Sequence, residues 1–184
     1  MNPSAFAAKS PSDRALALGQ QTLRIEAAAV EGLIARLDGA FVAAVALILG
    51  CRGRLIVSGI GKSGHVARKI ASTMASTGTP AYFVHPAEAS HGDLGMITRD
   101  DILLALSNSG ESEELVRIVP IVKRQGARLI AMTGDPQSSL AREADIHLDA
   151  GVSQEACPLN LAPTASTTAA LALGLSECFL GQWF

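Results

Sequence analysis

The chain has 184 residues, of which 48% are hydrophobic and 4% aromatic, and its formal net charge is −2 at pH 7. A chain of this length is most simply one domain with a core of Ala, Leu, Ile and Val. The charge, without a clustered stripe of Lys or Arg, argues against a nucleic-acid surface. The longest apolar run, Phe41 to Leu49, is too short to span a bilayer. Three widely spaced cysteines indicate a reduced, cytoplasmic protein.

Two helices are predicted before any strand. We expect residues 1–12, which contain prolines and serines, to form a flexible N-terminus and residues 13–184 to form one domain. Apolar residues at helical spacing predict a helix from Asp13, taken as its N-cap, to Leu37, and a second helix over 39–49.

Strands and helices then alternate along the rest of the chain. The predicted strands cover 54–58, 81–84, 102–106, 128–133 and 145–148, and the predicted helices cover 64–77, 113–125, 138–143 and 162–178. Short, wholly apolar strands separated by helices predict a five-stranded parallel sheet covered on both faces, a three-layer α/β/α fold. Ligands of such sheets bind at the carboxyl ends of the strands, so the loops after Ser58, Val84, Leu106 and Thr133 are the candidate site.

The loop after Leu106 carries the most specific chemical signal. It reads Ser107-Asn108-Ser109-Gly110-Glu111-Ser112 and leads into a predicted helix. Small hydroxyl donors and bare backbone N–H groups at a helix N-terminus suit a phosphate dianion. The loop has no Lys or Arg, which favours a phosphate that stays in place as a handle over one that is transferred. The loop therefore predicts a sugar-phosphate ligand.

The loop after the first strand, Gly59-Ile60-Gly61-Lys62-Ser63-Gly64, matches the G-x-G-x-x-G pattern of dinucleotide-binding proteins. The acidic residue expected at the end of the second strand is missing, and a P-loop would need Gly in place of Ile56. Nucleotide binding therefore stays a minor alternative. A purely structural interpretation, a Gly-rich turn with a solvated Lys62, also remains open.

A third cluster follows the second strand, where His85, Glu88, His91 and Asp93 fall within nine residues. Pro and Gly residues in this stretch predict a loop. Three interpretations remain open: proton handling by His91, structural hydrogen bonding, or a metal site.

Several strings in the sequence match one family. The chain resembles the sugar isomerase (SIS) domain, a flavodoxin-like fold, and within it the arabinose 5-phosphate isomerases. The matching strings, which span about residues 55–174, are Gly59 to His65, Ser76 to Pro80, Phe83 to Pro86, His91 to Met96, Ser107 to Glu111, Glu155 to Leu159 and Leu161 to Thr164.

The resemblance implies an aldose–ketose isomerase, an intramolecular oxidoreductase. Such enzymes interconvert D-ribulose 5-phosphate and D-arabinose 5-phosphate through a cis-enediol, supply Kdo for lipopolysaccharide or capsule, and need no cofactor or metal. It implies Glu155 as the base, Lys62 as the charge that stabilises the enediolate, His91 as a proton shuttle, and Glu111 as a partner of Lys62 or second acid/base. The implied substrate-binding residues are Gly61, Ser63, Ser107, Asn108, Ser109, Ser112, Thr164 and Ser166.

Two departures from the family pattern keep an alternative open. Many relatives continue into CBS repeats, and a Ser-His-Pro-Gly segment in relatives supplies a histidine to a neighbouring subunit, but neither is found here. The alternative is a SIS-fold sugar-phosphate-binding protein with little catalysis. The resemblance further implies a homotetramer or dimer, and the predicted helix 13–37 suits its subunit contacts. Two interpretations of the aromatic end 179–184 remain open: a further subunit contact, or a truncated or frame-altered end.

Overall fold

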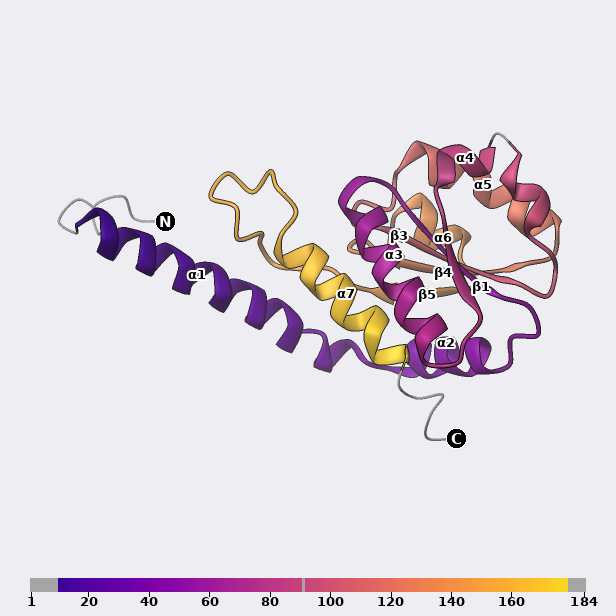
Figure 1. Cartoon of the computed structure of the whole chain (residues 1–184), viewed down its shortest axis with the longest axis horizontal. Helices are drawn as coiled ribbons and strands as arrows, with labels where there is room; N and C mark the ends of the chain where they lie inside the picture. Colours follow the sequence, from indigo (N-terminus) through magenta and orange to yellow (C-terminus); the bar gives the residue numbers. More distant parts are fainter. Residues whose placement is uncertain (1–9, 91, 179–184) are drawn as a thin grey trace.

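A computed structural model describes residues 10–90 and 92–178 as a three-layer α/β/α fold (Figure 1). The five strands form one parallel sheet in the order β2-β1-β3-β4-β5, which is the flavodoxin-like order. The strands are β1 (Leu55–Gly59), β2 (Ala81–Val84), β3 (Ile102–Ser107), β4 (Arg128–Thr133) and β5 (Ile146–Asp149). The helices are α1 (Pro11–Glu31), α2 (Gly39–Leu49), α3 (Gly61–Ser76), α4 (Pro86–Ser90), α5 (Glu113–Arg124), α6 (Ser139–Glu143) and α7 (Ala165–Cys178), with 3₁₀ turns η2 (Ile34–Arg36) and η3 (Asp93–Met96).

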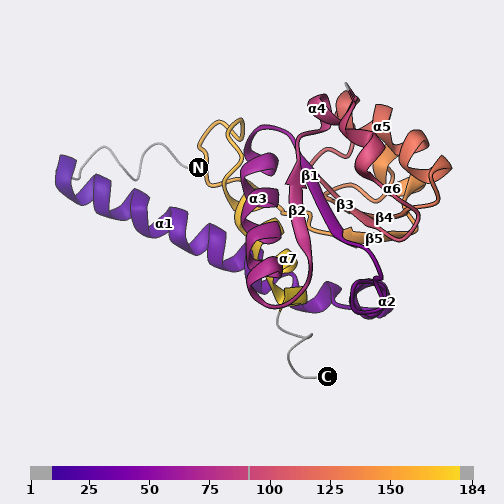
Figure 2. The ribbon, with the colours of Figure 1, turned by 45° about the vertical axis from the view of Figure 1, so that its right-hand side comes forward.

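Alternate residues of each strand enter two separate cores, because successive side chains of a strand point to opposite faces. In β3, Leu104 and Leu106 pack with α2, α3 and α7 on one face. Leu103 and Ala105 pack with α4, α5 and α6 on the other. The predicted parallel sheet with two covered faces is therefore confirmed (Figure 2).

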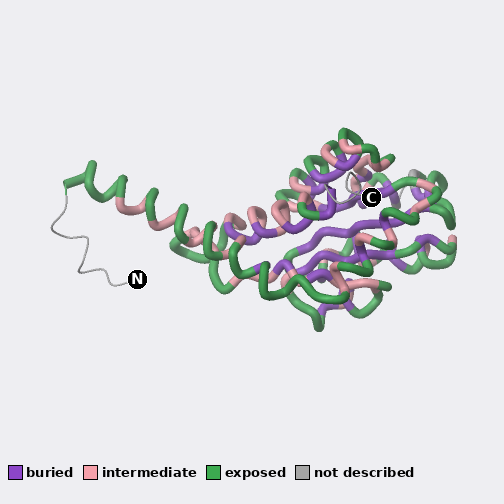
Figure 3. Tube along the Cα trace, turned by 90° about the horizontal axis from the view of Figure 1, so that it is seen from below, coloured by how far each residue is buried: buried purple, intermediate pink, exposed green. Residues whose placement is uncertain are grey.

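The first helix differs from the prediction at both ends. Its N-cap is Ser10, whose hydroxyl accepts a hydrogen bond from the Asp13 amide at 3.1 Å, and Pro11 occupies the first helical position, which suits proline. The helix ends at Glu31 instead of continuing to Leu37, and η2 follows. None of its residues is buried, and its N-terminal part projects beyond the body of the molecule (Figure 3).

Within the described residues, no single helix is both long and apolar enough to cross a membrane. One pair, Pro11–Arg36 and Gly39–Leu49, reaches the limits of length and composition only when the two parts are taken together, and they are bent by 86°.

The remaining boundaries follow the prediction with small shifts, and one stretch was wrong. Helix α2 and strands β2 and β4 have the predicted limits, whereas α3 begins three residues early, at Gly61. The segment after β2, predicted as a loop, contains the short helix α4 and the turn η3. Pro86 explains α4, because the fixed φ of proline favours the first position of a helix.

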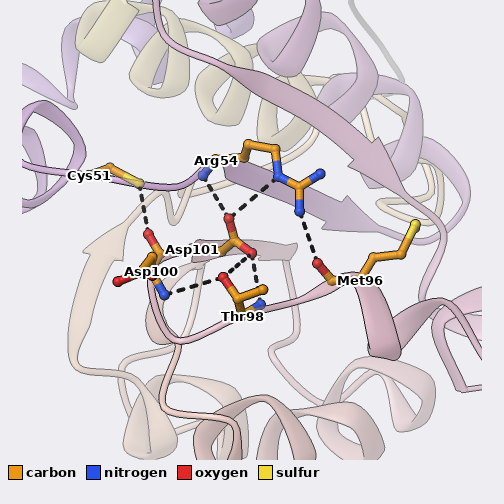
Figure 4. Close-up of polar contacts among 6 residues, drawn as sticks. All are labelled: Cys51, Arg54, Met96, Thr98, Asp100 and Asp101. Atoms are coloured by element: carbon orange, nitrogen blue, oxygen red, sulfur yellow. Dashed lines mark hydrogen bonds and ion pairs between the residues drawn. The ribbon is translucent and has the colours of Figure 1, made fainter.

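The amino edge of the sheet, opposite the predicted site, is held by a buried aspartate (Figure 4). The Asp101 carboxylate accepts hydrogen bonds from the backbone N–H groups of Arg54 at 2.7 Å and Thr98 at 2.8 Å, and from the Thr98 hydroxyl at 3.0 Å. The Arg54 guanidinium lies 3.6 Å from the same carboxylate and donates to the carbonyl of Met96. These contacts join the start of β1 to the segment that leads from η3 into β3.

Candidate functional site

Two adjoining hollows open at the carboxyl edge of the sheet, and Asn108 and Pro163 line both. The first, of about 40 Å³, lies over the carboxyl ends of β3 and β4, against α3 and α7. The polar residues on its wall are Ser63, Ser107, Asn108, Thr133, Ser166 and Thr167. The second, of about 220 Å³, is lined by the loop that follows β5, including Glu155 and Asn160. The edge at which the sequence predicts a ligand therefore carries two hollows. Another hollow, of about 260 Å³, lies at the opposite edge, among residues that precede β1 and β2, and its lining includes Cys51 and Pro80.

The turn between β1 and α3 brings backbone close to backbone. A Cβ on Gly64 would lie 2.8 Å from the carbonyl oxygen of Gly59, so only glycine permits this approach. The N-cap residue of α3, Ile60, makes no side-chain capping hydrogen bond, so no cap side chain occupies the N–H groups of the first turn. Lys62 is exposed in that first turn, and Ser63 is half-buried on the wall of the first hollow.

The loop after β3 is held by its own hydroxyls. The Ser107 hydroxyl lies 2.8 Å from that of Ser112 and accepts from the Gly110 amide at 3.1 Å, while the Ser109 hydroxyl accepts from the Glu111 amide at 3.2 Å. Gly110 has a φ of +67°, which L side chains rarely adopt. Ser112 is the N-cap residue of α5 and makes no side-chain capping bond to it. This helix N-terminus also keeps open N–H donors.

Glu155 lies in the loop between β5 and α7, at the N-terminus of α7. Its Oε2 accepts hydrogen bonds from the Thr164 amide at 2.8 Å, the Thr164 hydroxyl at 2.9 Å and the Ser166 amide at 3.2 Å. Partial burial raises the pKa of Glu155, but the hydrogen bonds from Ser166 and Thr164 lower it by more, so the pKa lies below its ordinary value. The group is therefore an ionised carboxylate at neutral pH.

The Glu111 side chain binds the N-terminus of α6. Its Oε1 accepts a hydrogen bond from the Ser139 amide at 2.7 Å, and the hydrogen bonds from Ser139 lower the pKa of this exposed carboxyl. Among the ion pairs of the described residues, none joins Glu111 to Lys62. A role for Glu111 as second acid or base stays a prediction.

The predicted proton shuttle, His91, lies outside the described residues. In the same segment, the half-buried His85 accepts a hydrogen bond from the Ala87 amide at 3.3 Å through Nδ1. Across the part of the chain that the structure describes, no group of three His, Cys, Asp or Glu side chains is placed to hold a metal ion.

The two residues predicted as secondary binding groups differ in their contacts. The Thr164 hydroxyl is engaged with Glu155, whereas the buried Ser166 hydroxyl has no hydrogen-bond partner among the described residues and lies on the wall of the first hollow. Of the candidate site residues, Ser63, Ser107, Asn108 and Ser166 are thus brought together around one hollow, with Glu155 on the adjoining one.

Two side chains that shape this edge, those of Thr133 and Arg36, have no role assigned from the sequence, although the loop after Thr133 belongs to the predicted site. Thr133 ends β4 on the wall of the first hollow, and its hydroxyl lies 2.8 Å from Nε2 of His147. Its place at the carboxyl end of a strand is a signal that could have identified it. Arg36 donates to the carbonyl of Gly151 and lies 3.5 Å from Asp149, so it braces the start of the loop that carries Glu155. No pattern in the sequence joins residues so far apart.

The structure defines a doubly wound α/β protein with a hollow at the carboxyl ends of its strands, the edge at which such folds bind small ligands. A model of the SIS domain matches residues 48–176, and the chain belongs to that family.

Comparison with known proteins narrows the relationship. The arabinose 5-phosphate isomerase KdsD of Pseudomonas aeruginosa is 61% identical over 155 residues, which are 84% of this chain and 48% of that protein. The KdsD of Escherichia coli K12 is 51% identical over 156 residues, with 85% of this chain and 48% of that protein covered. The chain thus spans about half the length of these curated relatives. A solved structure, E. coli CFT073 c3406 in complex with A5P, superposes with a TM-score of 0.87 at 38% identity and covers 96% of this chain and 95% of that one.

Proposed function

We propose that the chain catalyses the interconversion of D-ribulose 5-phosphate and D-arabinose 5-phosphate through a cis-enediol. The observation that carries the proposal is the likeness to the c3406 structure, since that chain was solved with A5P and is matched over nearly its whole length. The name of the KdsD relatives, arabinose 5-phosphate isomerase, supports the same reaction.

The open helix N-termini suit the substrate's phosphate. The N-cap residues of α3 and α5, Ile60 and Ser112, leave first-turn N–H groups without side-chain caps, and the hydroxyls of Ser63 and Ser107 lie on the wall of the adjoining hollow. These are neutral donors in a dipole field, which hold a dianion without activating it for transfer. The phosphate would therefore serve as the handle that orients the sugar.

The isomerisation needs a base that moves one carbon-bound proton between C1 and C2. Glu155 is ionised and lies on the wall of the second hollow, so it is our candidate for that base. Lys62, exposed at the start of α3, would stabilise the negative charge that develops on the enediolate oxygen. His91 would move protons between the two sugar oxygens. The proton returns to the neighbouring carbon, so the reaction is redox-neutral overall and requires no nicotinamide or flavin.

We further propose a cytoplasmic homotetramer or dimer, without nucleic acid or membrane as partner, whose product is used in Kdo synthesis. The exposed leucines Leu16 and Leu23 of the projecting helix α1 support an assembly, since exposed apolar side chains on a projecting helix are typical of subunit contacts.

The first test is turnover of D-arabinose 5-phosphate by the purified chain in heavy water, without added metal or nucleotide. We expect ribulose 5-phosphate to form with deuterium at the carbon next to the carbonyl, read by NMR. Binding without conversion would instead indicate a sugar-phosphate-binding protein. A requirement for a nicotinamide would indicate that the loop after β1, which starts at Gly59, binds a dinucleotide.

Glu155→Gln tests the assigned base. A positioned base contributes about 10²–10⁴-fold, so we expect kcat to fall by at least about 10²-fold while the substrate still stabilises the protein thermally. Glu143→Gln is a matched control, because Glu143 pairs with Lys123 away from the site at 3.1 Å. Wild-type turnover in Glu155→Gln would contradict the assignment.

A further inference from the structure

The contacts of Glu155 are confined to one of its two oxygens. All three hydrogen bonds that the carboxylate accepts end on Oε2, and none of the hydrogen bonds among the described residues ends on Oε1. Two of the three donors belong to Thr164, which provides its amide and its hydroxyl. Thr164 therefore provides most of the hydrogen bonds that hold the carboxylate, and the Ser166 amide provides the third.

Thr164 is itself held in a single orientation. Its hydroxyl accepts a hydrogen bond from the Ala156 amide at 2.8 Å, so its one proton is directed to Glu155 Oε2, 2.9 Å away. Its carbonyl accepts from the Thr167 hydroxyl at 2.7 Å and from the Thr168 amide at 3.0 Å, which anchors it to the first turn of α7. Through Thr164, the Glu155 carboxylate is held in a fixed position relative to helix α7, although Glu155 itself lies in a loop.

From this geometry we infer that Thr164 is a positioning residue, which locks Glu155 Oε2 at the N-terminus of α7 and leaves Oε1 to take the carbon-bound proton of the substrate. The inference rests on the proposed function for the identity of that proton.

A direct contact of Thr164 with the sugar is the competing role. A threonine hydroxyl has one proton, and that of Thr164 is already donated to Glu155. Thr164 therefore acts on the substrate only through Glu155. Ser166 is almost fully buried on the wall of the first hollow, and its side chain also helps to lower the pKa of Glu155.

The arrangement has a measurable consequence for Glu155. Hydrogen bonds and burial, and not a neighbouring charged side chain, set its pKa, and the hydrogen bonds prevail. Removing the Thr164 hydroxyl takes away one donor and should raise the pKa of the Glu155 carboxyl. It should also free the carboxylate to rotate away from the productive geometry, which lowers kcat more than it changes KM.

The experiment uses the full chain and two readouts. The pKa of Glu155 is measured by NMR titration of the ¹³C-labelled carboxyl, assigned by its loss in Glu155→Gln, and the pH profile of kcat/KM is measured with D-arabinose 5-phosphate. Both are recorded for wild type, Thr164→Val and Thr164→Ser, which retains the hydroxyl. Thr168→Val is the matched control, since the Thr168 hydroxyl donates to Glu26 at 3.1 Å on the α1 side of the helix. Thr164→Ala replaces the valine variant if that variant does not fold.

We expect Thr164→Val to raise the carboxyl pKa, to move the acid limb of the profile to higher pH and to lower kcat by about 10- to 100-fold, with Thr164→Ser close to wild type. An unchanged carboxyl pKa, or a raised KM with unchanged kcat, would overturn the inference. If the wild-type chain does not turn over the sugar, the proposed function fails by itself. The NMR titration, which needs no substrate, then still decides whether Thr164 holds the carboxylate.

Discussion

At the scale of one residue, Asp101 is a buried carboxylate whose negative charge is stabilised by hydrogen bonds and an ion pair. The side chain is almost wholly buried, 2% exposed as a residue, and is satisfied by two backbone amides, one hydroxyl and the Arg54 guanidinium. Burial raises the pKa of Asp101, but the hydrogen bonds from Thr98 and Arg54 lower it by more, so the pKa lies below its ordinary value. The ionised form is therefore part of the folded structure.

Asp101→Asn should lower the free energy of unfolding by about 2–3 kcal/mol, because an amide replaces an acceptor of charged hydrogen bonds. Asp100→Asn is the matched control, since Asp100 contributes its backbone carbonyl to the neighbouring contacts and its side chain is exposed. Urea denaturation at neutral pH measures both variants. Equal stability of the two would contradict the role given to Asp101.

The pH dependence of that contribution has a definite sign. The folded pKa lies below the unfolded one, so the stabilisation is complete above the ordinary pKa of aspartate and is lost as the pH falls through the folded pKa. The difference in stability between wild type and Asp101→Asn should therefore shrink on acidification.

At the scale of elements, the junction of β1 and α3 depends on two glycines that touch. A Cβ on Gly64 would lie 2.8 Å from the Gly59 carbonyl, and one on Gly59 would lie 2.9 Å from the carbonyl of Ser63. The G-x-G-x-x-G spacing is thus explained by the close packing of a strand end on a helix start, which needs no dinucleotide. That packing sets the place of Lys62 and Ser63 at the site.

Gly64→Ala should push α3 away from β1, lower the free energy of unfolding by about 1–3 kcal/mol and weaken sugar-phosphate binding together with it. Gly19→Ala offers the contrast, because nothing lies within 4 Å of its Cβ position in α1. That change should stabilise the chain by about 0.5–1 kcal/mol, as alanine is the better helix former. Thermal unfolding with and without D-arabinose 5-phosphate separates the two effects, and an undisturbed Gly64→Ala variant would argue against the close packing.

At the scale of the whole molecule, helix α1 stands out because none of its residues is buried. It contacts α7 and otherwise projects from the body, and Leu16 and Leu23, one heptad apart, are 66% and 69% exposed (Figure 1). A helix with this much apolar surface in water favours association with a second copy of the chain.

Leu16→Lys combined with Leu23→Lys should reduce the molar mass measured by light scattering from that of an assembly toward that of a 19.0 kDa monomer. Val42→Lys, at a site on α2 with 66% exposure, serves as the comparison for the loss of an exposed apolar residue elsewhere. A doubly substituted chain with unchanged mass would exclude α1 as the contact.

The prediction was most accurate where a local pattern decides the structure. Apolar runs and turn residues predict the limits of α2, β2 and β4 and the order of the five strands. They also predict that Ser107 and Asn108 follow the carboxyl end of β3, where they line a hollow. The prediction failed where competing local signals were close in strength, as at α4, where Gly and Pro predicted a loop and Pro86 started a helix.

The sequence by itself determined the fold class, the family and the residue types of the site, because periodicity, capping residues and motif strings act over a few neighbouring positions. Only the tertiary structure decided which partner each side chain has. Hydrogen bonds connect Glu111 with Ser139, Thr164 with Glu155, and Arg36 with Gly151. In each pair the two residues are nine or more positions apart in the sequence. Such pairings depend on how the sheet and its helices bring distant loops to one edge, and packing, not local preference, sets that geometry.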